Sequence, residues 1–333
     1  MSENSFSEGQ SERQANPQGM LFTERDGRIL HAIADYADGV LAKRQLKEMI
    51  WPAASVRAME MRLTKLHRHG YVDWPTPAQR MTKPVPEPVV WLGWQGALWL
   101  AGQQGVVVEP PRNTGENQLR RFEKRLHQAG FRWLREPGWS KLGHSIAVVD
   151  FLMAVDRGVR LLPGFVLESV IQESVFRAER DVVDVSFLGP NGRERQVTKE
   201  VIPDLFMAIV DTQRQIQGEP ARARFLIEYD GATHSNPKWG IEKAAPYALY
   251  IQSPAYKNRF GHNSGRWLVI TTGKVRMQNL IAQTRQEAGT LARTFWFTTL
   301  PLVKASANVL TSPIWWRTDW QEPGALFKFA DGT

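Results

Sequence analysis

The spacing of apolar residues changes near Gly143 and divides the chain into two parts that fold differently. Before this position, apolar residues recur at helical spacing in short runs, as Ile29, Leu30 and Ile33 do. After it, strand-like runs alternate with helical ones, which is typical of a mixed α/β domain. The length of 333 residues also fits about two domains.

The pattern of apolar residues between Leu21 and Trp74 predicts three short helices followed by a strand. Thr23 can cap the first helix, and Ser55 can cap the third, because a hydroxyl accepts a backbone N–H of the first turn. A basic third helix in this order indicates a winged helix-turn-helix, so we expect a DNA-binding domain over residues 21–110. The residues expected to contact DNA are Ser55, Arg57, Arg62, Lys65 and Arg68.

A proline-rich run, Thr76 to Pro88, follows this strand. Proline disrupts helix interiors and central strands, so we expect neither here and assign the run to the tip of the wing. The segment from Val89 to Trp94 is expected to return as a strand.

A basic stretch connects the two parts. Between Arg112 and Ser145 there are eight Lys and Arg residues against three Glu residues. We expect residues 111–142 to form a basic linker in which Arg120, Arg121 and Lys124 face phosphates. A solvated helical surface is the alternative interpretation of the same run.

The second part, residues 143–333, predicts a sheet whose strands are separated by helices. Strands are expected at 164–176, 184–188, 205–210, 224–229, 267–272 and 294–299, and helices at 145–159, 242–252 and 276–292.

Acidic residues lie at the ends of several of these predicted strands. Glu228 and Asp230 follow an apolar run and point to the same side, because side chains alternate along a strand. Asp204 opens another strand, and Glu173 lies within a third. Converging carboxylates suit a hard cation such as Mg²⁺ or Mn²⁺. The alternatives are surface residues paired with nearby arginines and, for Asp204, a simple turn residue.

This acidic pattern resembles that of the PD-(D/E)xK restriction-endonuclease-like nucleases. Pro203-Asp204 matches the first half of the motif, and Glu228-Tyr229-Asp230 matches the second. Asp230 stands where those nucleases usually have lysine. In some of them the lysine lies on a neighbouring helix, and Lys243 is the candidate here.

A wider resemblance, from about Leu21 to Trp316, is to the replication-relaxation family of plasmid and mobile-element proteins, grouped with MobC-type relaxases. The matching segments are Thr23-Glu-Arg-Asp, Gly143-His144-Ser, Val149-Asp150-Phe151, Ile202-Pro-Asp, Ile227-Glu-Tyr-Asp-Gly-Ala-Thr, Lys243, Tyr247, Tyr250 and Phe295-Trp-Phe-Thr-Thr. The resemblance implies an α/β protein with an N-terminal winged helix-turn-helix and a C-terminal restriction-endonuclease-like mixed-sheet domain.

The resemblance also implies a metal-dependent nickase acting on double-stranded plasmid or mobile-element DNA. It makes Glu173, Asp204 and Glu228 the metal ligands, with Asp204, Glu228, Asp230, Lys243 and His144 as catalytic positions. His234, in the loop after Asp230, is a further candidate base or ligand. A homodimer and accessory mobilization or replication proteins remain open as partners.

Two other functions fit the same residues. One is a non-catalytic DNA-binding replication or transcription factor with a degenerate nuclease-like domain, as the replacement of lysine by Asp230 favours. The other is a double-strand nuclease, which requires a dimer.

Composition limits the remaining classes. The absence of cysteine excludes disulfides, thiolate zinc sites and a cysteine nucleophile, and fits a cytoplasmic protein. A net charge of +8 favours a polyanionic partner. No apolar run is long enough for a membrane helix, and the polar residues 1–20 predict a flexible tail rather than a signal peptide.

Overall fold

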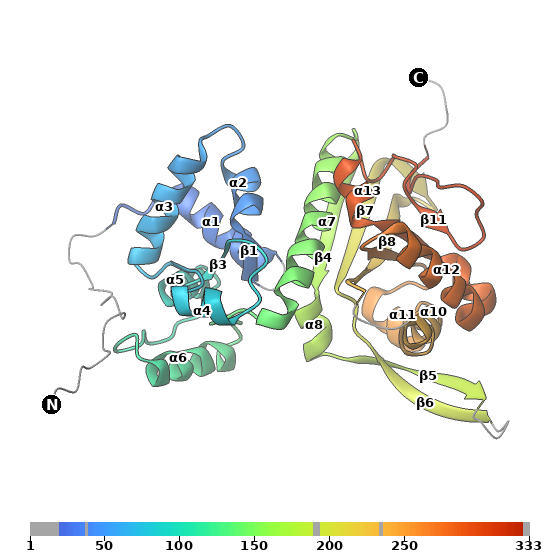
Figure 1. The fold of residues 1–333 in the computed structure, drawn as a ribbon, viewed down its shortest axis with the longest axis horizontal. Helices are drawn as coiled ribbons and strands as arrows, with labels where there is room; N and C mark the ends of the chain where they lie inside the picture. The colour runs from blue at the N-terminus through green and yellow to red at the C-terminus, as the bar shows by residue number, and fades with distance from the viewer. Residues whose placement is uncertain (1–19, 37–38, 189–193, 233–235, 329–333) are drawn as a thin grey trace. The chain divides into compact units, whose positions relative to one another are not determined.

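The computed structural model describes residues 20–36, 39–188, 194–232 and 236–328 (Figure 1). Residues 1–19 of the expected tail lie outside these ranges, and so does His234. The chain divides into two compact units, Met1–Gly143 and His144–Thr333. Within the described ranges, no helix combines the length and the apolar character needed to cross a membrane.

The first unit consists of short helices around a small antiparallel sheet with strand order β1-β3-β2. Its elements are α1 (Glu24–Asp35), β1 (Val40–Ala42), α2 (Lys43–Ile50), α3 (Val56–Arg68), β2 (Val72–Asp73), α4 (Pro77–Thr82), β3 (Val89–Leu92), α5 (Trp94–Gln103), α6 (Glu116–Gln128) and a 3₁₀ turn, η2 (Trp139–Lys141). The three helices and the strand expected before Trp74 are therefore present, with one additional short strand, β1, before α2.

The proline-rich run contains a helix, contrary to our expectation. α4 begins at Pro77, and the Thr76 hydroxyl accepts a hydrogen bond from the Gln79 N–H over 3.2 Å. Proline is tolerated at the first helical position because the N–H that it lacks has no partner there anyway. The following prolines, at positions 84, 86 and 88, do interrupt regular structure, as expected.

The stretch that we expected to act as a linker packs within the first unit. Phe122 and Leu126 of α6 are fully buried, and the Trp133 indole N–H donates to the Leu92 carbonyl over 2.9 Å. The opposite side of α6 exposes Arg120, Arg121 and Lys124.

A buried ion pair joins α1 to α3. Asp26 is fully buried, and its carboxylate accepts hydrogen bonds from the Thr23 N–H and from Arg62 Nε, over 2.7 and 2.6 Å. Arg62 also donates to the Leu21 carbonyl. Burial acts to raise the pKa of Asp26, but the hydrogen bonds from Arg62 and Thr23 outweigh it and hold that pKa below its ordinary value.

The second unit is built on a six-stranded mixed sheet with strand order β11-β10-β9-β8-β7-β4. Its strands are β4 (Phe165–Gln172), β5 (Asp181–Leu188), β6 (Glu194–Val201), β7 (Leu205–Ile216), β8 (Glu219–Asp230), β9 (Arg266–Thr271), β10 (Phe295–Thr299) and β11 (Trp316–Arg317). Its helices are α7 (Leu142–Arg160), α8 (Glu173–Ala178), α9 (Asn236–Trp239), α10 (Ala245–Tyr250), α11 (Pro254–Phe260), α12 (Lys274–Ala288) and α13 (Leu300–Ala305), with a π turn, η3 (Gly240–Ala244), and a 3₁₀ turn, η4 (Gly289–Thr294).

Helices lie on both sides of this sheet, with α7 on one side and α10 to α12 on the other (Figure 1). Phe206, Leu226 and Val269 pack in one buried cluster with Tyr247 of α10 and Leu280 of α12. β8 runs antiparallel to β7 and parallel to β9. The start of β7 therefore meets the carboxyl ends of β8 and β9 at one edge of the sheet.

A separate hairpin, β5 and β6, extends from this unit (Figure 1). It is attached at its base, where the Asp181 carboxylate binds Arg259 and the Tyr250 hydroxyl. The strand expected over residues 164–176 is shorter than predicted, because β4 ends at Gln172 and Glu173 begins α8.

We expect Asp26→Asn to lower the free energy of unfolding of the first unit by about 2–3 kcal/mol, since Arg62 loses its buried counter-ion. A carboxylate with a lowered pKa stabilises the fold above its unfolded pKa, and this contribution is lost as the pH falls through the folded value. The difference between wild type and variant, measured by urea denaturation, should therefore shrink below about pH 4. Asp35→Asn, at the exposed end of the same helix, is the control, and an equal loss of stability there would contradict the prediction.

Candidate functional site

Two buried carboxylates face each other where β7 begins and β8 ends. Leu205 pairs with Ile227, so Asp204, one residue earlier, stands opposite Glu228. The Asp204 N–H donates to the Ile227 carbonyl over 3.0 Å, and its Oδ2 accepts from the Tyr229 N–H over 2.7 Å. Asp204 is 9% exposed and Glu228 is 1% exposed. The sheet register thus places two negative charges side by side, largely out of water.

Cations and a hydroxyl from three other elements meet these carboxylates. His144, near the start of α7, has its Nε2 at 3.0 Å from Asp204 Oδ1. The Lys243 ammonium donates to Glu228 Oε1, and the Tyr247 hydroxyl donates to Glu228 Oε2 over 2.9 Å. Lys243 lies in the π turn between α9 and α10, a local irregularity that is frequent at functional sites.

The two carboxyl groups differ in acidity. Burial raises the pKa of Glu228, as does the negative charge of Asp204, and the result is about 7 despite Lys243. Burial also acts to raise the pKa of Asp204, but His144, Lys243 and the Tyr229 N–H hold it below its ordinary value. Asp204 is therefore ionised at neutral pH, whereas Glu228 is divided between its two forms.

The environment favours the charged forms of the two basic groups. Burial acts to lower the pKa of His144 and of Lys243, but the nearby carboxylates raise both values above the ordinary ones. Tyr247 is protonated, because burial and the charge of Glu228 raise its pKa far above the usual value. The site therefore combines one or two negative charges with the ammonium of Lys243 and a histidine whose charged form is favoured.

Asp230 points to the same side of β8 as Glu228 but binds different partners. Its carboxylate accepts hydrogen bonds from Arg276 Nε and Nη2 of α12 over 2.6 and 3.0 Å, and from the Thr271 hydroxyl over 3.2 Å. A carboxylate held by a two-pronged arginine contact is fixed in direction. Asp230 therefore binds Arg276 and Thr271 and takes no direct part in the hydrogen bonds of the Asp204–Glu228 pair.

Glu173 is also held elsewhere, in an ion pair with Arg177 one turn along α8. Its charge still contributes to the raised pKa of both His144 and Tyr247. Among the described residues, no group of three or more His, Asp or Glu side chains is arranged to hold a metal ion. The structure therefore brings together two of the three expected ligands, Asp204 and Glu228, with His144 and Lys243.

A family model, Replication-relaxation, matches residues 31–264, which include Asp204, Glu228 and the three side chains that contact them. The chain belongs to the replication-relaxation family. Membership supports a role in the processing of DNA during replication or mobilization, and DNA-related partners. No curated protein and no solved structure matches the chain.

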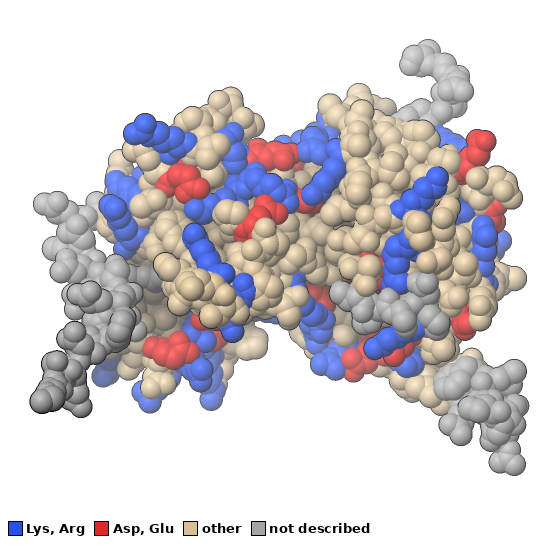
Figure 2. All heavy atoms as spheres, in the orientation of Figure 1, with Lys and Arg blue, Asp and Glu red and all other residues tan. Residues whose placement is uncertain are grey.

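For a member of this family, the basic residues of the first unit are the candidates for DNA contact. Figure 2 shows Lys and Arg side chains spread over the visible face of that unit. Arg57, Lys65 and Arg68 of α3 are exposed. The Ser55 hydroxyl caps α3 by accepting the Ala58 N–H over 3.2 Å, and Arg62 is engaged with Asp26. Both therefore have structural partners within the unit.

Sequence reasoning missed three partners of the acidic residues. Tyr247, to which we assigned no role in the site, contacts Glu228, and Arg276 and Arg177 bind Asp230 and Glu173. Tyr247 follows Lys243 by four residues, so helical spacing could have placed both on one face. The Arg177 contact is also at four-residue spacing, whereas Arg276 comes from a distant helix and has no local signal.

Asp230→Ala should lower the free energy of unfolding by about 3–5 kcal/mol, because it removes the carboxylate that binds the largely buried Arg276 guanidinium. The double variant Asp230→Leu and Arg276→Met should recover most of that loss, since neither charge remains. Chemical denaturation of the three proteins measures both effects. A single variant as stable as wild type would show that this pair does not hold α12 to the sheet.

Proposed function

We propose that this protein binds double-stranded plasmid or mobile-element DNA with its first unit and nicks one strand. The residues that we propose for the cleavage site are Asp204, Glu228 and Lys243. The observation that carries the proposal is the buried pair of opposed carboxylates, with a lysine and a histidine bound to them. Burying acidic groups is costly, and such groups with shifted pKa values are concentrated at functional sites.

The donor set fits a divalent cation in its chemistry. Asp204 and Glu228 supply the hard carboxylate oxygens that Mg²⁺ and Mn²⁺ prefer, and these two residues would hold the ion. Glu173, the third ligand expected from the sequence, is paired with Arg177 and would have to leave it to join them. When bound, such a cation activates water and stabilises the charge that develops on a phosphate.

The protein's own cations have a separate task. The Lys243 ammonium and His144, in its protonated form, would attract and orient the phosphodiester, whose charge is negative. In the nicking step, a water oxygen forms a bond to phosphorus while one P–O ester bond breaks, and the water proton passes to the leaving oxygen. Lys243 contacts Glu228 from a neighbouring helix, which supports the interpretation that it replaces the lysine absent at position 230.

The two folds support the same proposal. In the first unit, α2 and α3 precede a two-residue strand, and a long connection returns to β3, as in a winged helix-turn-helix. In the second unit, the acidic site lies at strand ends of a mixed sheet, as we expect of a PD-(D/E)xK domain.

A second function, DNA binding without cleavage, is favoured by one observation. Each of the four carboxylate oxygens of Asp204 and Glu228 already faces a partner: His144, the Tyr229 N–H, Lys243 and Tyr247. A site satisfied in this way can persist as a structural feature, so the two functions must be separated by experiment.

Supercoiled plasmid incubated with the purified protein and Mn²⁺ or Mg²⁺ should yield open-circular DNA. Asp204→Asn and Glu228→Gln should lower the nicking rate by about 100-fold or more, because each removes a carboxylate that would hold the cation. Both should bind DNA at least as well as wild type, while Lys243→Met should slow nicking less.

Glu168→Gln is the matched control, because Glu168 is an exposed carboxylate of the same sheet, paired with Arg222. It should nick at the wild-type rate. Binding without cleavage by the wild-type protein would support the non-catalytic function, and linear product would indicate a double-strand nuclease.

Arg57→Ala and Arg68→Ala should each weaken DNA binding and, where they contact phosphate, lower the slope of log affinity against log salt by about one. The reason is that fewer condensed counterions are released on binding when one phosphate contact is lost. Fluorescence anisotropy over a salt series measures the slope. Unchanged slope and affinity in the double variant would show that this part of α3 does not touch DNA.

A further inference from the structure

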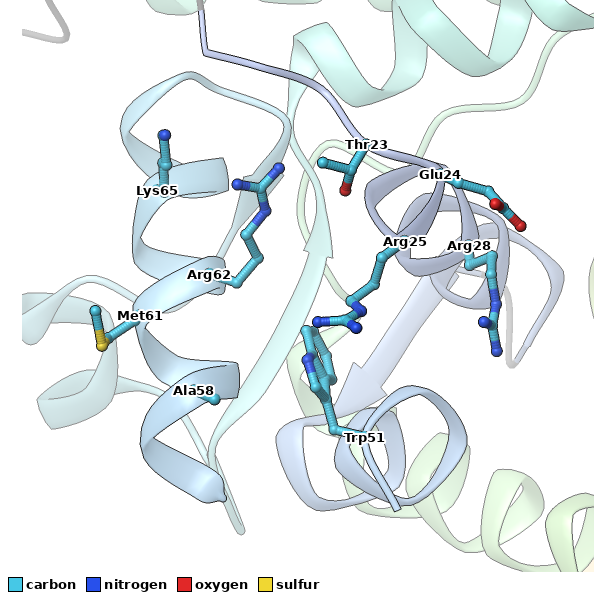
Figure 3. Close-up of a pocket in the computed structure, with 9 residues that line it drawn as sticks. All are labelled: Thr23, Glu24, Arg25, Arg28, Trp51, Ala58, Met61, Arg62 and Lys65. Atoms are coloured by element: carbon cyan, nitrogen blue, oxygen red, sulfur yellow. The ribbon is translucent and has the colours of Figure 1, made fainter. Parts of the chain in front are cut away.

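A cleft of about 760 Å³ lies between α1 and α3 in the first unit (Figure 3). We call it the α1–α3 cleft. Its lining includes Arg25 and Arg28 from α1, Trp51 from the end of α2, and Met61, Arg62 and Lys65 from α3. Neither Arg25 nor Arg28 was among the residues expected from the sequence to contact DNA.

Positive charge exceeds negative charge on the lining of this cleft. Arg25, Arg28 and Lys65 are exposed, and none of them has a hydrogen-bond or ion-pair partner among the residues that the structure describes. Glu24 is the acidic residue on the lining. Three unpaired cations around one hollow repel each other, so an anion in the cleft would relieve that repulsion.

The walls of the cleft are fixed. Arg62 crosses from α3 to the buried Asp26 of α1, and its side chain also reaches the Leu21 carbonyl. Arg62 therefore acts as a brace between the two helices rather than as a free cation. A rigid site binds a ligand at a lower entropic cost than a site that must first be ordered.

The spacing of the cations suits a chain of phosphates rather than one small anion. Arg25 and Arg28 are three residues apart, so they lie on one side of α1, and Figure 3 shows Arg25 extended beside Trp51. Lys65 lies on the other wall, on the exposed side of α3 that also carries Arg68. Charges spread along both helices match a ligand whose negative charge is also extended.

We propose that the α1–α3 cleft binds the sugar-phosphate backbone of duplex DNA, with Arg25 and Arg28 as its phosphate contacts on α1 and Lys65 on α3. This inference rests on the proposed DNA-binding function and assigns to α1 a part of the interface that α3 alone would not supply. Guanidinium groups bind phosphate through two parallel hydrogen bonds, which fixes orientation as well as adding affinity. These contacts position the protein on DNA without reading its sequence.

The test measures binding of the full-length protein to a short fluorescent duplex over a salt series. Arg25→Gln with Arg28→Gln should reduce the slope of log affinity against log salt by about two, and Lys65→Gln by about one. The weakening should be the same for unrelated duplex sequences. The control is Arg160→Gln, which removes one charge from the far end of α7, about 24 Å along the helix from His144.

The outcomes separate this inference from the function on which it rests. A wild-type protein that binds no duplex overturns the DNA-binding function itself. Normal wild-type binding with an unchanged slope in the Arg25/Arg28 variant overturns the cleft assignment alone. If that variant instead loses affinity for inorganic phosphate or ATP while its duplex binding is unchanged, the cleft holds a free anion, and our choice of DNA is wrong.

Discussion

The register between β7 and β8 forces two carboxylates into one buried place, and the acidic site is organised around the cost of keeping them there. Desolvation and mutual repulsion both oppose ionisation of Asp204 and Glu228. The protein meets this cost with donors from three elements: His144 of α7, Lys243 of the π turn and Tyr247 of α10. The positions of these helices around the sheet edge are therefore tied to the carboxylates.

The first unit solves a related problem with a different result. The side chain of Asp26 is as little exposed to solvent as that of Glu228, but Arg62 and Thr23 satisfy it fully, and its pKa falls instead of rising. A carboxylate held in this way stays ionised and serves as an anchor. The raised pKa of Glu228 indicates a group whose charge is incompletely compensated, which is the condition expected of a reactive or ligand-binding carboxyl.

Much of the architecture followed from local pattern, while the partners of the charged groups did not. Alternation along β8 correctly placed Glu228 and Asp230 on one side, and the capping residues Thr23 and Ser55 marked helix starts. The pairing of Asp26 with Arg62 spans 36 residues, and that of Asp230 with Arg276 spans 46. Such contacts depend on how elements pack, which spacing within one segment cannot encode. The helix at Pro77 was missed because proline content outweighed its position at a helix start.

The length of the π turn at Gly240–Ala244 affects the direction in which Lys243 points. A π turn holds one residue more than the α-helical turn that it replaces, and each residue turns the helix by about 100°. The direction of Lys243 is thus set partly by an extra residue, independently of the buried face of α10 that packs Tyr250 and Ala248 against the sheet. Loss or gain of one residue in this turn would re-aim the ammonium while leaving the core side of the helix in place. Relatives could in this way acquire or lose the lysine beside Glu228 through a change of length, without any substitution at the acidic positions.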